Sequence, residues 1–242
     1  MEKTLVKYCI EGNLEKAKEI YNENSSIKRE DAFYFACHNN HLEIAKWLYS
    51  LEDNKYTHPN IDNIFFSACY RGNIEIAKWL LTTNNNINIH SRNDMAFKYS
   101  VSHNQLEVVK WLYSLDDKID IHENGGNIFM CVCINGDFEM AKLLYSLDGK
   151  IDIHKEHDYL FVIICENGNF KMAKWLLSLD GKIDIHTHYD LALLRAHTNG
   201  HIEIAKWLVS LCDGYEYDFD DNLNYEGTIT EDIARWRKNK CL

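Results

Sequence analysis

Apolar residues recur along the chain with the spacing of an amphipathic helix. In the stretch HLEIAKWLYSL, the apolar side chains of Leu42, Ala45 and Leu48 fall on one face, whereas Glu43 and Lys46 fall on the opposite face. Apolar positions separated by three and four residues predict a helix with one buried side. The phrase returns throughout the chain, so the same amphipathic helix is expected many times.

A second kind of segment precedes each amphipathic phrase and is more uniformly apolar. Examples are AFYFAC at 32–37, IFMCVCI at 128–134 and YLFVIIC at 159–165. A short helix that is apolar on most sides is expected to be buried on most sides. Helices of this length are marginal alone in water, so we expect each pair to be stabilised by stacking on its neighbours.

The two kinds of segment repeat with a step of 32 residues. Ala-Lys-Trp-Leu stands at 45–48, 77–80, 173–176 and 205–208, and close variants stand at 109–112 and 141–144. Self-similarity at this period predicts a solenoid of stacked helix pairs. The repeats are expected at about 1–26, 27–58, 59–90, 91–122, 123–154, 155–186 and 187–218, followed by a degenerate C-terminal capping repeat at 219–242.

A column of glycine and asparagine separates the two helices of each repeat. Both residue types tolerate the left-handed backbone that ends a helix, so a sharp turn is predicted at each of these positions. The column comprises Gly12, Asn40, Gly72, Asn104, Gly136, Gly168 and Gly200. The next column often holds a capping residue, and Asn13, Asn73, Asp137 and Asn169 are predicted to cap the second helix. The phrase DGKIDIH between repeats predicts an extended or hairpin finger.

These motifs resemble ankyrin repeats. The resemblance rests on NNHLEIAKWLYSL at 39–51 and NGHIEIAKWLVSL at 199–211, together with INIH or IDIH between repeats, and it covers nearly the whole chain. It implies an all-α solenoid of about seven helix-pair repeats with a capping repeat. The near-identical units further resemble the ankyrin-repeat proteins of giant DNA viruses of amoebae. The family's Thr-Pro-Leu-His opening of the first helix is absent, and acidic residues are predicted to cap that helix instead: Glu30, Asp62, Asp94, Asp158 and Asp190.

Composition narrows the class of protein. A formal charge of −11 argues against a nucleic-acid ligand, since such proteins present basic patches. The sequence has no long apolar run and no pattern of a signal peptide, so neither a membrane span nor secretion is expected. We therefore expect a monomeric cytoplasmic protein whose eight cysteines are reduced.

The residues of three columns could have either a structural role or a chemical one. The histidines 58, 90, 122, 154 and 186 could bind a metal, but equivalent atoms of adjacent repeats are expected about 8–10 Å apart, which favours a structural role. The column of Cys9, Cys37, Cys69, Cys133 and Cys165 is interpreted as buried thiols, and the tryptophan column as inter-repeat packing. No catalytic motif is found, so we expect no enzyme, no cofactor and no metal.

A binding site is expected where the repeats differ from one another. The resemblance implies that recognition uses the finger tips and the end of the first helix. The predicted partner-binding residues are Tyr70, Arg71, Arg92, His103, Asn135 and Glu166. The expected function is a non-catalytic scaffold that binds another protein, which is a host protein if the chain is viral. The alternatives are a substrate adaptor for a ubiquitin ligase and a target of hydroxylation at the finger residue Asn88.

Overall fold

The computed structural model describes residues 2–23, 29–51, 61–116, 119, 121, 123–149 and 151–211. Within these residues the chain forms 14 helices and no strand. The first helices of the repeats are α1 (Glu2–Glu11), α3 (Glu30–His38), α5 (Ile61–Tyr70), α7 (Ser91–Ser102), α9 (Glu123–Asn135), α11 (Lys155–Glu166) and α13 (Thr187–Thr198). The second helices are α2 (Leu14–Glu23), α4 (Leu42–Ser50), α6 (Ile74–Thr83), α8 (Leu106–Leu115), α10 (Phe138–Leu147), α12 (Phe170–Asp180) and α14 (Ile202–Ser210).

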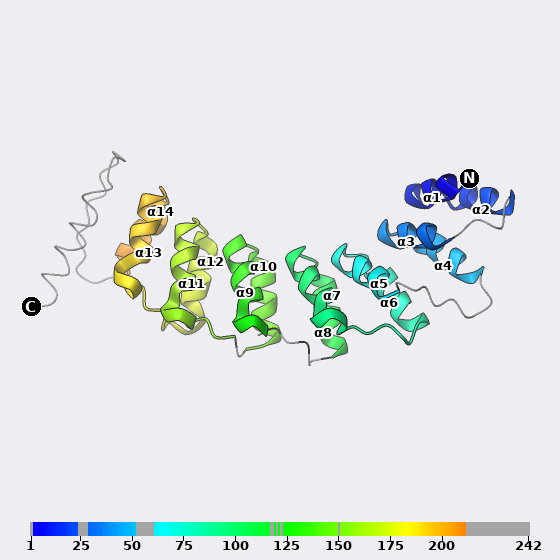
Figure 1. Ribbon diagram of the computed structural model, residues 1–242. Helices are drawn as coiled ribbons and strands as arrows, with labels where there is room; N and C mark the ends of the chain where they lie inside the picture. Colours follow the sequence, from blue (N-terminus) through cyan, green and yellow to red (C-terminus); the bar gives the residue numbers. More distant parts are fainter. Residues whose placement is uncertain are drawn as a thin grey trace, which may run out of the picture. The chain divides into compact units, whose positions relative to one another are not determined.

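The predicted all-α array of helix pairs is confirmed. Each first helix lies beside the second helix of its own repeat, as Figure 1 shows for α3 and α4 and for α13 and α14. The chain divides into two compact units, 1–120 with α1 to α8 and 121–242 with α9 to α14. In the first unit, α1 packs on α3, α3 on α5 and α5 on α7. In the second unit, α9 packs on α11 and α11 on α13.

The turn between the two helices of a repeat has the predicted left-handed residue. The φ angle is positive at all seven positions of the Gly/Asn column, for example 65° at Asn40, 78° at Gly72 and 80° at Gly136. After Gly72 the amide of Asn73 donates to the carbonyl of Ala68 at 2.9 Å, which satisfies a carbonyl at the end of α5. Each turn therefore closes one helix and reverses the chain into the next.

The core contains a phenylalanine column, against which the half-buried tryptophans of the following repeats pack. The five phenylalanines are each no more than 2% exposed, and their positions keep the 32-residue step: Phe33, Phe65, Phe97, Phe129 and Phe161. Phe33 lies 6.2 Å from Trp79 of the next repeat, measured between ring centroids. The same inter-repeat contact recurs at Phe65 with Trp111, Phe129 with Trp175, and Phe161 with Trp207. The predicted packing role of the tryptophans is confirmed.

The predicted side-chain caps are mostly wrong. Asn13 Oδ1 does accept the amide of Lys16 at 3.0 Å, but Asn73, Asp137 and Asn169 make no capping hydrogen bond. Asn73 instead donates through Nδ2 to the carbonyls of Cys37 and His38 in the preceding repeat, both at 3.0 Å. The carbonyls at the end of a first helix lack helical partners, and this amide satisfies two of them. Asn73 therefore joins two repeats rather than capping its own helix, and Asn169 does the same by donating to the carbonyl of Ile134 at 3.1 Å.

Three members of the acidic column depart from the predicted capping role, whereas Glu30 and Asp62 lie in the first turns of α3 and α5. No side-chain cap is present at the start of α7, α11 or α13, where several residues have a left-handed backbone. Asp94, Asp158 and Asp190 are buried there and accept hydrogen bonds from histidines four residues earlier. The fingers show extended residues at Asn84, Asp116 and Asp148 but no strand within the described residues. The predicted C-terminal cap at 219–242 and its residues lie outside the described residues.

The thiols of the cysteine column are expected to resist labelling in the native protein. Cys9, Cys37, Cys69, Cys133 and Cys165 are all 0% exposed. Burial raises the pKa of Cys9 to about 12 and raises the pKa of the other four thiols further, so the reactive thiolate is scarce. Cys131 is exposed and is expected to react rapidly.

Peptide mapping by mass spectrometry after a short pulse of a thiol reagent tests this expectation. Denaturant should release the five protected sites. Fast labelling of Cys69 or Cys165 under native conditions would contradict the burial of the column.

Candidate protein-binding surface

Aromatic rings line the first helices of the first unit and touch one another from repeat to repeat. We call this set the aromatic ladder: Tyr34 and His38 on α3, Phe66 and Tyr70 on α5, and Tyr99 and His103 on α7 and directly after it. Its ring centroids are 5.5 Å apart for Tyr34 and His38, 6.5 Å for His38 and Tyr70, and 5.1 Å for Tyr70 and His103. Phe66 lies 5.2 Å from Tyr70 and 5.1 Å from Tyr99.

The ladder combines a fixed base with an exposed outer part. Phe66 and Tyr70 are half-buried, whereas Tyr99 is 44% exposed and His103 is exposed. His103 Nδ1 lies 2.9 Å from the carbonyl of Tyr99, which holds the imidazole against the end of α7. Rings that are already packed lose little conformational freedom when a partner covers them. The ladder is therefore a preorganised apolar surface with polar atoms at its edges.

His38 is held neutral within the ladder. Its Nδ1 lies 2.8 Å from the hydroxyl oxygen of Ser67 on α5, which joins two repeats. Burial lowers the pKa of His38, and the positive charge of Arg71 lowers it further. The histidine consequently serves as a hydrogen-bonding ring at neutral pH, while Arg71 supplies the charge.

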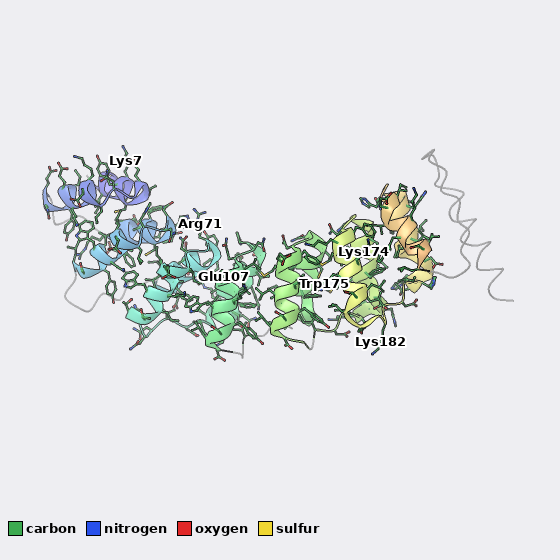
Figure 2. All side chains as sticks on the ribbon, turned by 180° about the vertical axis from the view of Figure 1, so that it is seen from behind. Lys7, Arg71, Glu107, Lys174, Trp175 and Lys182 are labelled. Carbon is green, nitrogen blue, oxygen red and sulfur yellow. The ribbon has the colours of Figure 1, made fainter. Side chains whose placement is uncertain are left out.

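The structure brings three of the predicted binding residues together. Tyr70 and His103 are in ring contact, and the exposed Arg71 follows Tyr70 at the end of α5. Figure 2 shows Arg71 projecting from the edge of the first unit at which α5 ends. Two of these three residues, Tyr70 and His103, belong to the aromatic ladder, and their role in binding stays a prediction.

Arg92 lies apart from these three residues, in the finger that precedes the helical part of α7. It lines a small surface hollow together with Asp62, Phe66, Asn88 and Met95. Phe66 belongs to both the hollow and the aromatic ladder. The hollow thus lies beside the ladder with an exposed guanidinium on its rim.

The two remaining predicted residues belong to the second unit. Asn135 is exposed at the end of α9. Glu166 at the end of α11 accepts a hydrogen bond from Arg195 Nη1 at 3.0 Å, so its charge is already paired. Neither residue lies in an aromatic cluster like that of the first unit.

Sequence reasoning missed Tyr34, Phe66 and Tyr99. Tyr34 and Phe66 occupy one column, since they are 32 residues apart, and Tyr99 is shifted by one position from that column. Ring-to-ring contact depends on the spacing of neighbouring first helices, which a single repeat does not reveal. An aromatic residue at the same position in two adjacent repeats was the available signal.

The histidine column forms clamps between successive fingers. His90 Nδ1 lies 2.6 Å from Asp94 Oδ1, and His90 Nε2 lies 3.2 Å from Asp116 Oδ2 in the next finger. His154 repeats this arrangement with Asp158 at 2.7 Å and Asp180 at 2.8 Å. Both ring nitrogens of these histidines face carboxylates, and no group that could hold a metal is found among the described residues. His58 and His122 of this column lie outside the described residues.

The clamps are expected to weaken as pH rises. Hydrogen bonds to Asp94 and then Asp116 raise the pKa of His90, and hydrogen bonds to Asp180 and then Asp158 raise the pKa of His154. A raised pKa in the folded state means that the stabilisation is complete below the unfolded pKa of about 6.5 and is lost as pH rises through the folded value.

A His154→Gln variant tests this expectation against the wild type. His38 and His197 have lowered pKa values and act in the opposite direction, so the informative quantity is the difference between the two proteins. We expect the wild type's advantage in thermal midpoint to shrink from acidic to mildly alkaline pH. An advantage that does not change with pH would contradict the role of the charged clamp.

Comparison with known proteins agrees with the helix pairs and their period. The family described as "Ankyrin repeats (3 copies)" matches residues 3–93, 33–124, 97–189 and 128–221, which overlap and together span most of the chain. No curated protein matches the sequence. The family match covers all the helix pairs that the structure describes. The chain belongs to the ankyrin-repeat family.

Proposed function

We propose that this chain is a non-catalytic scaffold that binds a partner protein through the aromatic ladder and Arg71. Ankyrin repeats generally mediate protein–protein interaction. The observation that carries the proposal is the unbroken chain of ring contacts over α3, α5 and α7, with Tyr99 and His103 open to solvent. Tyrosine and arginine are the residue types that most often dominate binding energy at protein interfaces.

Affinity capture from an amoebal lysate tests the proposal. The wild type is compared with a ladder variant, Tyr70→Ala/Arg71→Ala/His103→Ala, and with a control variant on the second helices, Lys46→Ala/Lys78→Ala/Lys110→Ala. Lys46 and Lys110 are exposed on α4 and α8, and Lys78 is partly exposed on α6. Circular dichroism first establishes that the helicity of both variants equals that of the wild type.

We expect a protein that is captured by the wild type and by the control variant and is lost with the ladder variant. Loss of one central hot-spot residue typically costs about 2 kcal/mol or more, and the triple variant should therefore abolish capture. A partner that the ladder variant retains in full would refute the placement of the site.

The viral resemblance leads to a narrower version of the same proposal. In that version the chain acts in the host cytoplasm and its partner is a host protein. A substrate adaptor for a ubiquitin ligase is the alternative, and the same capture distinguishes the two. Subunits of a ligase among the proteins retained by the wild type favour the adaptor, whereas their absence from a capture that yields a partner favours a plain scaffold.

Hydroxylation of Asn88 is the second alternative. Asn88 is exposed, and its Oδ1 accepts the amide of His90 at 3.0 Å. Asp152 and Asp184 accept the amides of His154 and His186 in the same way at 2.9 Å. The side chain therefore fixes the finger turn, and mass analysis of the peptide containing Asn88 would detect an added oxygen atom.

A further inference from the structure

Successive repeats are joined by contacts that recur along the chain, and the first of them is aromatic. A buried phenylalanine contacts the tryptophan of the next repeat, with ring centroids 6.2–6.4 Å apart in the pairs Phe33 with Trp79, Phe65 with Trp111, Phe129 with Trp175 and Phe161 with Trp207. The same spacing assigns Leu143 to Phe97, so the series of tryptophans is interrupted in the fifth repeat. A leucine offers no aromatic ring and less apolar surface than an indole.

The second contact is a hydrogen bond from the residue before a second helix to a carbonyl of the preceding repeat. The bonds run from His41 to Ile10, from Asn73 to Cys37 and His38, and from Asn169 to Ile134, over 2.9–3.1 Å. Gln105 and His201 of the same column also carry N–H groups that can donate. The fifth repeat holds Asp137 in this column, and a carboxylate has no hydrogen to donate.

The third contact fixes the backbone where one repeat passes into the next. The histidine at the end of a repeat contacts an aspartate four residues later, at the start of the next first helix. The pairs are His90 with Asp94, His154 with Asp158, and His186 with Asp190. The residue four positions after His122 is Gly126, which has no side chain to accept such a bond.

All three departures belong to one joint. The columns assign Gly126, Asp137 and Leu143 to the joint between the repeats at 91–122 and 123–154. Every other joint from the second repeat onwards keeps an aspartate, an N–H donor and a tryptophan at these positions: Asp62, Asn73 and Trp79; Asp94, Gln105 and Trp111; Asp158, Asn169 and Trp175; and Asp190, His201 and Trp207. The chain divides into its two compact units within two residues of this joint, between residues 120 and 121. The residues at the joint therefore give a physical reason for the division.

We propose that the two units unfold independently of each other, because the residues at this joint cannot make the three contacts that couple the other repeats. In a stacked array, stability is the sum of the repeats and of the interfaces between neighbours, so cooperative unfolding breaks up at the weakest interface. The aromatic ladder belongs to the first unit alone, and its folding consequently does not depend on the second unit. The inference goes beyond the proposed function, since it holds whatever the chain binds.

Hydrogen exchange of the full chain in rising urea, measured by mass spectrometry of its peptides, tests the inference. Two matched variants, Phe65→Ala and Phe161→Ala, each remove a phenylalanine that is no more than 2% exposed, one from each unit. We expect each variant to lower the urea midpoint of the peptides from its own unit by about 1 M or more, and to leave the midpoint of the other unit unchanged. A shift of both units together in either variant would overturn the proposal, even where the wild-type midpoints coincide.

Transferring the residues of this joint to another joint tests their role in the coupling. The variant Asn73→Asp/Trp79→Leu gives the joint between the second and third repeats two of the residue types found at the weak joint. Peptides from α4 and α8, which lie on opposite sides of the altered joint within the first unit, are followed in the same experiment. We expect them to share one urea midpoint in the wild type and to have separate midpoints in the variant. A variant in which α4 and α8 still lose protection together would contradict the assignment of the weak joint to Asp137 and Leu143.

Discussion

Replacing Phe161 by alanine is expected to lower the free energy of unfolding by about 3–5 kcal/mol, as is typical for removal of a fully buried phenylalanine. Phe161 is 1% exposed, and its ring centroid lies 6.3 Å from that of Trp207 in the next repeat. The substitution removes apolar contacts within the repeat and also the contact that joins it to the next one. In a stacked array, the loss of an interface weakens the coupling between neighbours as well as the repeat itself.

Phe170→Ala provides the matched control. Phe170 also contacts Trp207, with ring centroids 5.3 Å apart, but it is only half-buried, and the ammonium of Lys174 lies 3.9 Å from its ring. We expect this variant to lose about 1–2 kcal/mol, because less apolar surface returns to water. Urea unfolding followed by circular dichroism compares the two variants, and equal losses would contradict the assignment of Phe161 to the core.

Replacing Gly168 by alanine is expected to cost about 2–4 kcal/mol, the second of the large effects. The φ angle of Gly168 is +76°, and the left-handed backbone alone costs an L-residue about 1–2 kcal/mol. A Cβ atom would also lie 2.5 Å from Cε1 of the His201 ring in the next repeat. The ring must therefore move, and its packing at the joint between two repeats is lost.

The variant Gly200→Ala separates the backbone cost from the steric cost of adding a Cβ atom. Gly200 has a φ angle of +79°, but no described atom lies within 4 Å of an added Cβ. Only the backbone cost is expected there, so the variant should be about 1–2 kcal/mol more stable than Gly168→Ala. Indistinguishable unfolding midpoints for the two variants would contradict this expectation, because they would show that the His201 ring can move without loss of stability.

Most of the fold could be predicted from the sequence because the repeats keep the same residues at the same step. A left-handed column, a phenylalanine column and a tryptophan column each return in successive repeats, so local rules act repeatedly on equivalent positions. Most of the capping predictions failed because they treated each helix alone, although the cap at Asn13 is present. Asn73 satisfies carbonyls of another repeat, and Asp94 accepts a hydrogen bond from His90, and neither contact follows from the propensity of one segment.

The candidate site was predicted only in part, for a similar reason. Variability singled out Tyr70, Arg71 and His103, and the structure places Tyr70 and His103 in contact. The variability between repeats gave no reason to choose Tyr34 or Tyr99, because their place in the ladder depends on the distance between neighbouring first helices.

Site-specific photo-crosslinking tests the central claim most directly. A benzophenone amino acid replaces Tyr99, which is 44% exposed in the aromatic ladder, or Glu107, which is exposed on α8 and labelled in Figure 2. We expect irradiation in the lysate to attach a partner protein to position 99 and not to position 107, and excess unlabelled wild type to abolish that product. A crosslink to the same partner at position 107 with none at position 99 would contradict binding through the first helices of the first unit.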